Sequence, residues 1–433
     1  MTRSEHYRNF GIVCLAGTSG LFLLLAAAIA AQAQTFTVLH KFSGSDGANP
    51  YAGLTIDRGG NLYGTTQFGG HLSSTCPGGC GTIFKFAPRG SGGVLSKLYE
   101  FTAGPQGYPQ ARVVFGPDGT LYGTASGFGG YGDNGYGTVF HLRPPAAVCK
   151  SVSCPWSETV LFAFDAATGF FPLGDLTFDA AGNIYGTTQF GGLTQYCGGG
   201  GCGVAYQLTQ SGGAWTESIL HAFTSGPDGA YPNSGVIFDR AGNLYGTAPQ
   251  DDYQGGSYGL VYQLSPSGSD WTLNALYYFQ AGVDGAYPYA GLISDPAGNL
   301  YGATRNGPDE AGTVFELTSS GGGWEYNLVY GLPPGDGCCG PYGTLVADAA
   351  GNLYGATLTA GAYGQGNVFK LTPSNGGWTY TDLYDFTGHD DGGQPYGSLV
   401  LDANGNIYGT TYAGGNFECQ GDFGCGVVFE ITP

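Results

Sequence analysis

Apolar and polar residues alternate in short runs along the chain, and one pair of runs recurs seven times. Residues 53–57 read Gly-Leu-Thr-Ile-Asp, and after a Gly-rich turn residues 61–66 read Asn-Leu-Tyr-Gly-Thr-Thr. A period of two, broken by Gly and Asn, predicts two β-strands joined as a hairpin. The second run returns, at spacings of 53 to 63 residues, at 120–125, 183–188, 243–248, 299–304, 352–357 and 406–411.

Two further strands are expected after each hairpin. A Gly-rich loop leads to Gly-Thr-Val-Phe or a variant, as at residues 81–84 and 312–315, and a fourth run ends in Leu-Tyr-x-Phe, as at residues 98–101 and 383–386. Each period therefore holds four short antiparallel strands. Because a propeller has ~4 to 8 blades of four strands, the pattern predicts an all-β, seven-bladed β-propeller.

The two ends of the repeat region complement each other. The last period stops after its third strand at residues 429–431, whereas residues 36–42 read like a fourth strand with no first three before it. The N-terminal strand is therefore expected to complete the last blade and close the ring without an exposed edge.

Residues 1–33 are predicted to be a signal peptide, which leaves residues 34–433 as the propeller. Arg3 and Arg8 precede an apolar run at 21–31 and a small-x-small site at 31–33. The run is too short for a spanning helix, so the mature protein is expected to be secreted or periplasmic, without a membrane span. After loss of Arg3, Arg8 and Glu5, 11 basic residues face 31 acidic ones, a net charge of −20. Nucleic acid and anionic lipid are therefore disfavoured as partners.

Ten cysteines remain once Cys14 leaves with the signal segment. They fall into close pairs: Cys76 with Cys80, Cys149 with Cys154, Cys197 with Cys202, Cys338 with Cys339 and Cys419 with Cys425. We predict local disulfides, with Cys338 and Cys339 either joined as a vicinal pair or reduced. The pairs lack the His partners of a zinc site, so no metal is predicted. Loops this short contribute roughly 2 kcal/mol each, so they are interpreted as clips on surface loops.

The recurring Gly-Asn-Leu-Tyr-Gly-Thr-Thr, Gly-Gly and Gly-Thr-Val-Phe resemble the tandem repeat of the choice-of-anchor GloVer proteins, which are exported bacterial proteins. The resemblance covers essentially the whole mature chain and implies an extracellular repeat protein, but no particular reaction. Members carry C-terminal surface anchors; this chain ends at Pro433 directly after a strand, so such an anchor is not expected. The first hairpin is also similar to those of NHL and gluconolactonase-type propellers, and Kelch repeats stay open as distant relatives.

One register position gives the residues expected nearest to the axis. These residues follow a proline at the entry to each inner strand: Tyr51, Gln110, Leu173, Asn233, Tyr289, Tyr342 and Tyr396. Two positions further on, only blades 2 and 3 carry charges, Arg112 and Asp175. Aromatic rings beside a guanidinium and a carboxylate suit a sugar or another polyhydroxylated ligand. The alternative is an ion pair that only plugs the channel, with the tyrosines as filler.

The histidines and the acidic turns offer weaker candidates. His40 and His221 occupy an aromatic site of the fourth strand, and His141 aligns with polar, outward-facing positions. His71 and His389 lie in loops and, with Asp390, Asp391 and Glu418, form a second candidate cluster; the alternative is that they are merely solvated.

Asp-Gly pairs recur in the loops that lead into the inner strands: Asp46, Asp228, Asp284, Asp336 and Asp391. Calcium needs ~6 to 8 converging oxygens. One Asp per blade is more typical of structural turns, so no cofactor is expected and calcium stays a minor alternative.

No Gly-x-Ser-x-Gly or His-Glu-x-x-His motif occurs in the sequence. We therefore expect an exported, non-enzymatic binding or scaffold propeller, with a glycan or another cell-surface molecule of the envelope or matrix as its ligand. The alternative is a carbohydrate-active enzyme, a lyase, hydrolase or lactonase, with its site at the axial mouth. A glycosidase needs two carboxyl groups ~5 to 10 Å apart, and Asp175 has no evident partner in this register.

Overall fold

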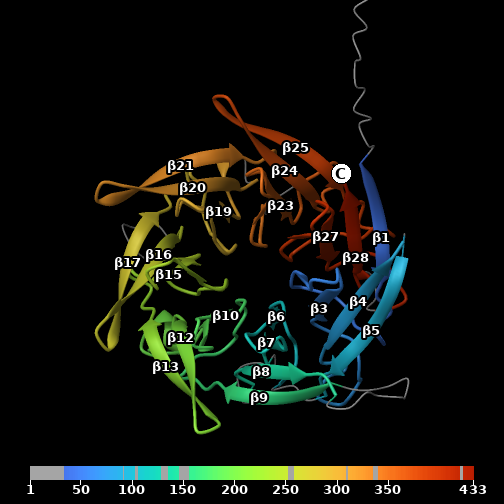
Figure 1. The fold of residues 1–433 in the computed structure, drawn as a ribbon, viewed down its shortest axis with the longest axis horizontal. Helices are drawn as coiled ribbons and strands as arrows, with labels where there is room; N and C mark the ends of the chain where they lie inside the picture. The colour runs from blue at the N-terminus through green and yellow to red at the C-terminus, as the bar shows by residue number, and fades with distance from the viewer. Residues whose placement is uncertain are drawn as a thin grey trace, which may run out of the picture. The chain divides into compact units, whose positions relative to one another are not determined.

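The computed structural model describes residues 34–90, 92–102, 106–127, 135–145, 156–251, 258–308, 311–334, 340–419 and 423–433. Within them, 28 strands form seven four-stranded antiparallel sheets. The sheets stand around a common axis as blades (Figure 1), so the predicted seven-bladed propeller is confirmed. The proposed signal segment lies outside the described residues.

Each blade begins with a short hairpin nearest to the axis. The innermost strands are β2 (Thr55–Ile56), β6 (Val114–Phe115), β10 (Thr177–Phe178), β14 (Ile237–Phe238), β18 (Ile293–Ser294), β22 (Val346–Ala347) and β26 (Val400–Leu401). The second strands are β3 (Leu62–Thr66), β7 (Leu121–Ala125), β11 (Ile184–Thr188), β15 (Leu244–Ala248), β19 (Leu300–Thr304), β23 (Leu353–Thr357) and β27 (Ile407–Thr411).

Longer strands form the outer half of each blade. The third strands are β4 (Thr82–Arg89), β8 (Thr138–Arg143), β12 (Val204–Ser211), β16 (Leu260–Ser267), β20 (Thr313–Ser320), β24 (Asn367–Ser374) and β28 (Val427–Thr432). The fourth strands are β5 (Gly92–Glu100), β9 (Ser157–Ala163), β13 (Ala214–Ala222), β17 (Asp270–Tyr278), β21 (Gly323–Gly331), β25 (Gly377–Asp385) and β1 (Thr35–Lys41). A short 3-10 helix, η2 (Cys197–Gly199), lies in the loop between β11 and β12.

The N-terminal strand closes the ring. β1 pairs antiparallel with β28 from Thr35 opposite Thr432 to Lys41 opposite Val427, and the last sheet has the order β1-β28-β27-β26. Figure 1 shows the blue and red ends of the chain side by side. The predicted closure is confirmed, and no edge is left open between the first and last blades.

An Asp-Asn-Tyr network holds the turn of the inner hairpin, which explains the recurring Asn-Leu-Tyr. Asp57 Oδ1 accepts hydrogen bonds from the backbone N–H groups of Gly59 and Asn61, and its Oδ2 accepts from Asn61 Nδ2 and the Tyr63 hydroxyl. Asp179, Asp239, Asp348 and Asp402 repeat it. Each carboxylate thus satisfies several donors of a tight turn.

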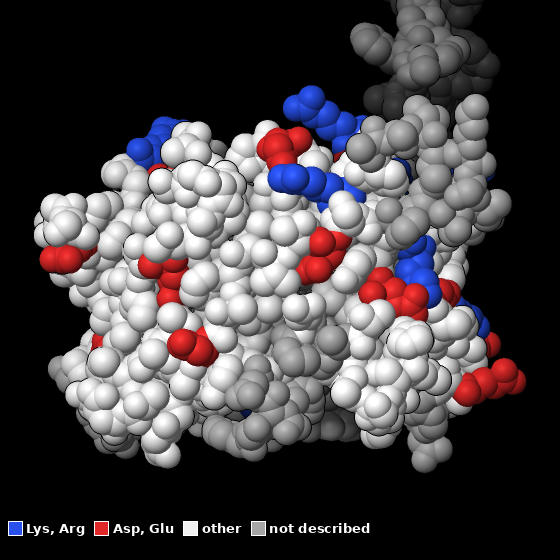
Figure 2. All heavy atoms as spheres, turned by 90° about the horizontal axis from the view of Figure 1, so that it is seen from below, with Lys and Arg blue, Asp and Glu red and all other residues white. Residues whose placement is uncertain are grey.

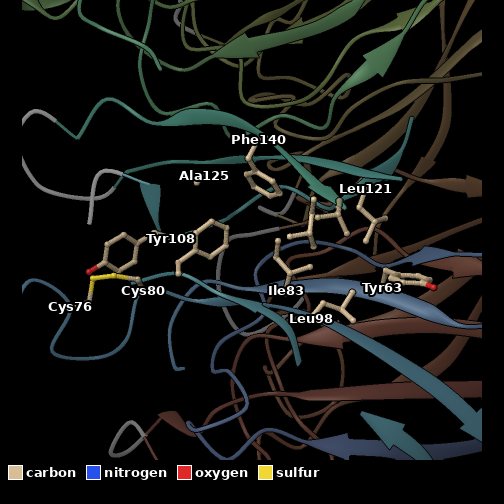
Figure 3. Close-up of a cluster of buried hydrophobic side chains, with 12 residues drawn as sticks. Tyr63, Cys76, Cys80, Ile83, Leu98, Tyr108, Leu121, Ala125 and Phe140 are labelled. Atoms are coloured by element: carbon tan, nitrogen blue, oxygen red, sulfur yellow. A yellow bond between two sulfur atoms is a disulfide. The ribbon is translucent and has the colours of Figure 1, made fainter. Parts of the chain in front are cut away.

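The core lies between neighbouring sheets. The glycine in Leu-Tyr-Gly-Thr makes room for the aromatic ring of the next strand: a Cβ added at Gly64 would lie 2.5 Å from the Phe84 ring. Figure 3 shows the cluster between blades 1 and 2, where Ile83 and Leu98 meet Leu121 and Phe140. Burial of these apolar surfaces is the main source of stability.

Three disulfides confirm the predicted local pairing: Cys76–Cys80, Cys197–Cys202 and Cys419–Cys425. The interpretation as surface clips is wrong for the first, because Cys76 and Cys80 are both fully buried in the cluster of Figure 3. Loop length alone did not indicate that both cysteines pack into the cluster between blades 1 and 2.

The other two predicted cysteine pairs are not confirmed. Cys149 and Cys154 both lie outside the described residues, so the disulfide expected between Cys149 and Cys154 stays a prediction. The same holds for Cys338 and Cys339, whose state as a vicinal pair or as free thiols is left open.

No helix among the described residues is long and apolar enough to cross a membrane. Charged side chains are sparse on the face drawn in Figure 2, where they lie between wide stretches of uncharged surface. The small share of charged residues, 10% of the sequence, accounts for this.

Candidate ligand site at the propeller axis

A cavity of about 90 Å³ lies at the axis, and all seven register residues line it. These are Tyr51, Gln110, Leu173, Asn233, Tyr289, Tyr342 and Tyr396, each half-buried. The prediction that this position faces the axis is therefore met by the geometry.

A strained turn precedes six of these seven residues and directs the chain toward the axis. In six blades the residue before the proline has positive φ, for example 53° at Asn49 and 59° at Tyr231. Such values are uncommon outside glycine and need support from neighbouring groups. The backbone N–H groups of Asn49 and Tyr231 donate to the carbonyl oxygens of Cys425 and Cys202. The Cys419–Cys425 and Cys197–Cys202 disulfides thus brace the entry to the next blade.

Four tyrosines form a continuous aromatic arc over blades 5, 6, 7 and 1. Ring centroids lie 5.1 Å apart for Tyr289 and Tyr342, 5.3 Å for Tyr342 and Tyr396, and 4.6 Å for Tyr396 and Tyr51. The Arg305 guanidinium lies over the rings of Tyr289 and Tyr342 at 5.9 and 5.7 Å. The rings therefore cover one another, and the arc offers the cavity hydroxyls and ring edges more than open faces.

The polar groups of the cavity are only partly satisfied within the protein. The hydroxyls of Tyr51 and Tyr289 make no hydrogen bond to another described residue, and neither does Oδ1 of Asn233, although that atom is sealed from solvent. Burial raises the pKa of Tyr51, and the neighbouring Tyr396, Tyr289 and Tyr412 raise it further. Tyr51 is therefore a neutral phenol that can donate a hydrogen bond.

Arg112 and Asp175 form an ion pair, with Arg112 Nε 2.6 Å from Asp175 Oδ2. The backbone N–H of Arg112 also donates to Asp175 Oδ1 at 3.1 Å. Asp175 lines the cavity, whereas Arg112 lies outside its lining.

The same link recurs elsewhere in the ring with neutral side chains. The N–H of Gly291 donates to Thr344 Oγ1 at 3.1 Å, and that of Thr344 donates to Ser398 Oγ at 2.9 Å. Asp175 thus takes the place of a hydroxyl that ties a blade to the one before it. This repeated link, which the sequence pattern did not reveal, favours a structural role for the ion pair.

The residues of the second candidate cluster, His71, His389, Asp390 and Asp391, do not contact one another through a shared hydrogen bond or ion pair in the described residues. Asp391 accepts hydrogen bonds from the Thr387 N–H and the Tyr384 hydroxyl, which makes it a turn residue. Asp390 pairs with Lys41 at 2.9 Å, and His71 and His389 are exposed. Within the described residues, no three His, Cys, Asp or Glu side chains are placed to hold a metal ion.

Asp46, Asp228 and Asp284 serve the same kind of turn as Asp391. Each accepts a backbone N–H four residues or fewer before it and a hydrogen bond from His40, His221 or Tyr277. The prediction that these histidines replace a tyrosine is confirmed. Asp336 lies outside the described residues.

His141 differs from its prediction as a polar, outward position. It is 2% exposed and stacks on Tyr122 with ring centroids 4.1 Å apart. The residues at the same register position also contact the tyrosine of the second strand: Lys85 lies over the Tyr63 ring, and Gln207 donates to the Tyr185 hydroxyl. Alignment of the repeat gave the register of His141 correctly but could not show this contact.

A closed ring of seven four-stranded sheets with a polar cavity on its axis defines the class, a seven-bladed β-propeller. The chain belongs to the Gloeobacter/Verrucomicrobia repeat family, whose profile matches residues 25–198, 157–337 and 326–433. This confirms the resemblance to GloVer repeats. No curated protein matches the sequence.

Two solved structures are similar to this chain at low identity. A protein from Thermus thermophilus assigned as an oxidoreductase (glucose dehydrogenase) has 15% identity and a TM-score of 0.41, over 92% of this chain and 100% of its own. A protein of unknown function from Dyadobacter fermentans has 10% identity and a TM-score of 0.43, over 92% and 97%.

Proposed function

We propose that the protein is an exported, non-enzymatic binding propeller whose axial cavity takes one end of a glycan or of another polyhydroxylated molecule. The observation that carries the proposal is the convergence of all seven register residues on one cavity. The hydroxyls of Tyr51 and Tyr289 have no hydrogen-bond partner among the described residues, and the buried Oδ1 of Asn233 is unpaired there too. Buried polar groups are normally paired, and a ligand hydroxyl or an ordered water in the cavity would give these groups a partner.

The size of the cavity limits what it can hold. Sites that enclose a whole small ligand usually measure ~300 to 1,000 Å³, whereas this one holds about 90 Å³. The cavity therefore accommodates a terminal hydroxymethyl group or the edge of one sugar ring, with the rest of the ligand outside the cavity. Because the tyrosine rings already cover one another, hydrogen bonds outweigh stacking in this site.

A carbohydrate-active enzyme is the second candidate, and the composition of the cavity lining disfavours it. Asp175 is the only acidic residue among the described residues that line the cavity, and Arg112 already pairs with it. A paired-carboxylate glycosidase would need a second carboxyl group there. An extracellular or periplasmic location is supported by the three disulfides, which form in oxidising compartments.

A glycan array probed with the mature chain tests the proposal. We expect binding to a subset of neutral glycans, loss of at least about tenfold in affinity for Asn233→Ala and Tyr289→Ala, and no change for Tyr363→Ala. Tyr363 is the matched control because it is 60% exposed on the same face and lies outside the cavity. Unchanged affinity in both cavity variants would move the site elsewhere.

Two further readouts separate the alternatives. Binding is expected to persist in EDTA, since Asp46, Asp228, Asp284 and Asp391 are occupied in holding turns. Mass spectrometry of a bound glycan after long incubation is expected to show the intact molecule. A cleaved or unsaturated product would instead support the enzyme.

A further inference from the structure

A second recess lies between blades 2 and 3, on the face opposite to the entrance of the axial cavity. It measures about 780 Å³ and is lined by the inner turns of both blades, the outer strands of blade 2 and the outer hairpin of blade 3, including Asp118, His141, Arg143 and Trp215. Its volume falls in the ~300 to 1,000 Å³ range of small-molecule sites.

The equivalent recess between blades 4 and 5 shows the arrangement of tryptophan and tyrosine that is usual in this repeat. It measures about 770 Å³, and there Trp324 packs edge-on against Tyr245 with centroids 5.8 Å apart. The same contact recurs for Trp271 with Tyr185 and for Trp378 with Tyr301, both at 6.4 Å. At these three junctions the tryptophan of one blade packs edge-on against a tyrosine of the blade before it, and this contact joins the two blades.

The junction of blades 2 and 3 departs from this rule. Trp215 occupies the tryptophan position, but the Tyr122 ring is stacked on His141, with an interplanar angle of 7°. Trp215 is half-buried and packs against the cluster that contains Tyr122 and Leu208, but it forms no stacked or edge-on ring pair within the described residues. The exposed part of its indole lines the recess.

The hydrogen bonds around His141 leave one nitrogen of its ring available. Thr120 Oγ1 donates to Asp118 Oδ1 at 2.8 Å, so it must accept from His141 Nε2, 2.5 Å away. The proton is therefore on Nε2, and Nδ1 is an acceptor without a partner among the described residues. Burial and the nearby Arg143 lower the pKa of His141 against the opposing effect of Asp118, which keeps the ring neutral.

Arg143 supplies a positive charge at the edge of the recess. Its side chain is exposed and forms no ion pair or hydrogen bond with another described residue. Only 13 Lys and Arg face 32 Asp and Glu in the whole chain, so an unpaired guanidinium next to a neutral imidazole and an indole is a specific combination.

We propose that this recess binds an acidic sugar residue of a polysaccharide. The apolar face of the sugar ring lies against Trp215, its carboxylate pairs with Arg143, and one hydroxyl donates to His141 Nδ1. A guanidinium pairs with a carboxylate through two parallel hydrogen bonds, and aromatic rings accept the C–H groups of a sugar. The proposal is independent of the axial cavity.

Calorimetry with α-1,4-linked trigalacturonate, and with the neutral galactose trisaccharide for comparison, tests the proposal. We expect the acidic trisaccharide to bind at least about tenfold more tightly than the neutral one, and Arg143→Gln to remove this preference. Trp215→Ala is expected to weaken both ligands. Thermal melting checks that each variant is folded.

Matched controls come from the recess between blades 4 and 5. Arg240→Gln and Trp324→Ala should leave the affinity unchanged, as should Tyr289→Ala in the axial cavity. Equal binding of the two trisaccharides, no binding by the wild type, or full affinity in Arg143→Gln would overturn the proposal. Loss of trigalacturonate binding in Tyr289→Ala alone would also overturn it and would assign that ligand to the axis.

Discussion

Tyr206 and Tyr262 place hydroxyl groups inside the sheet stack at a position where the other five blades have phenylalanine. Both side chains are fully buried, and neither hydroxyl has a hydrogen-bond partner among the described residues. An unsatisfied buried polar group lowers stability, whereas a hydrogen-bonded one contributes about 0.5 to 1.5 kcal/mol.

Tyr262→Phe is therefore expected to raise the free energy of unfolding by about 1 kcal/mol in urea denaturation. Tyr245→Phe serves as the control, because the Tyr245 hydroxyl donates to Asp239 and accepts from Gln263 Nε2. That variant should be less stable than the wild type. A loss of stability in Tyr262→Phe would show that the hydroxyl is satisfied in solution.

On β25, partial burial and the charge of nearby Asp385 raise the pKa of Asp382 to about 6. A carboxyl whose pKa is higher in the folded state binds more protons when folded, so its contribution to stability is lost as pH rises from about 4 to 6. Asp382→Asn should stabilise the protein at pH 7 and have little effect near pH 4.

Asp348→Asn should behave in the opposite way. Hydrogen bonds from Asn352, Tyr354 and Ala350 lower the pKa of Asp348 against the effect of burial. Its contribution is present above the unfolded pKa of 3.8 and is lost below it, so the variant should be destabilised at neutral pH. Melting curves at pH 4, 5, 6 and 7 distinguish the two. Parallel curves for both variants would contradict this assignment.

At the scale of elements, β1 closes the ring by pairing with β28, and one aromatic side chain of β1 also packs against blade 6. Phe36 stacks on Tyr384 with centroids 3.6 Å apart and lies 5.8 Å from both Phe386 and Phe429. Phe36→Ala should lower the free energy of unfolding by about 2 to 3 kcal/mol, less than for a fully buried ring. Thr37→Ala on the same strand should cost under about 0.5 kcal/mol. Equal effects would mean that β1 is dispensable.

The loop disulfides connect stability to the axial cavity. The carbonyl oxygen of Cys202 accepts a hydrogen bond from the Tyr231 N–H. This bond supports the positive φ of Tyr231, two residues before Asn233. A Cys197→Ser and Cys202→Ser double variant should lose roughly 2 kcal/mol and also bind an axial ligand more weakly. Tyr196→Ala in the same loop, 40% exposed, should do neither. Unchanged affinity in the double variant would show that the Cys197–Cys202 disulfide does not influence the axial cavity.

Across the whole molecule, repetition made the fold predictable. Seven copies of one hairpin set the number of blades, and the unmatched strands at residues 36–42 and 429–431 set the closure. The register of Tyr51 and Asn233 followed from counting after each proline. These features depend on backbone periodicity, which a single sequence contains.

What the repeat did not reveal depends on side-chain rotamers and on contacts between blades. Arg112 and Asp175 stood out as charges, but the parallel links of Thr344 and Ser398 became visible only from the distances. His141 stacks on Tyr122, and Trp215 is left without a ring partner among the described residues. The pattern of the repeat in the sequence does not indicate either feature.

The most direct test of the axial site is a crystal structure of the mature protein soaked with a glycan selected on the array. We predict density for one sugar end in the axial cavity, within hydrogen-bond distance of Asn233 and the Tyr51 hydroxyl. Ordered water alone in the cavity, with the glycan bound elsewhere, would contradict the account.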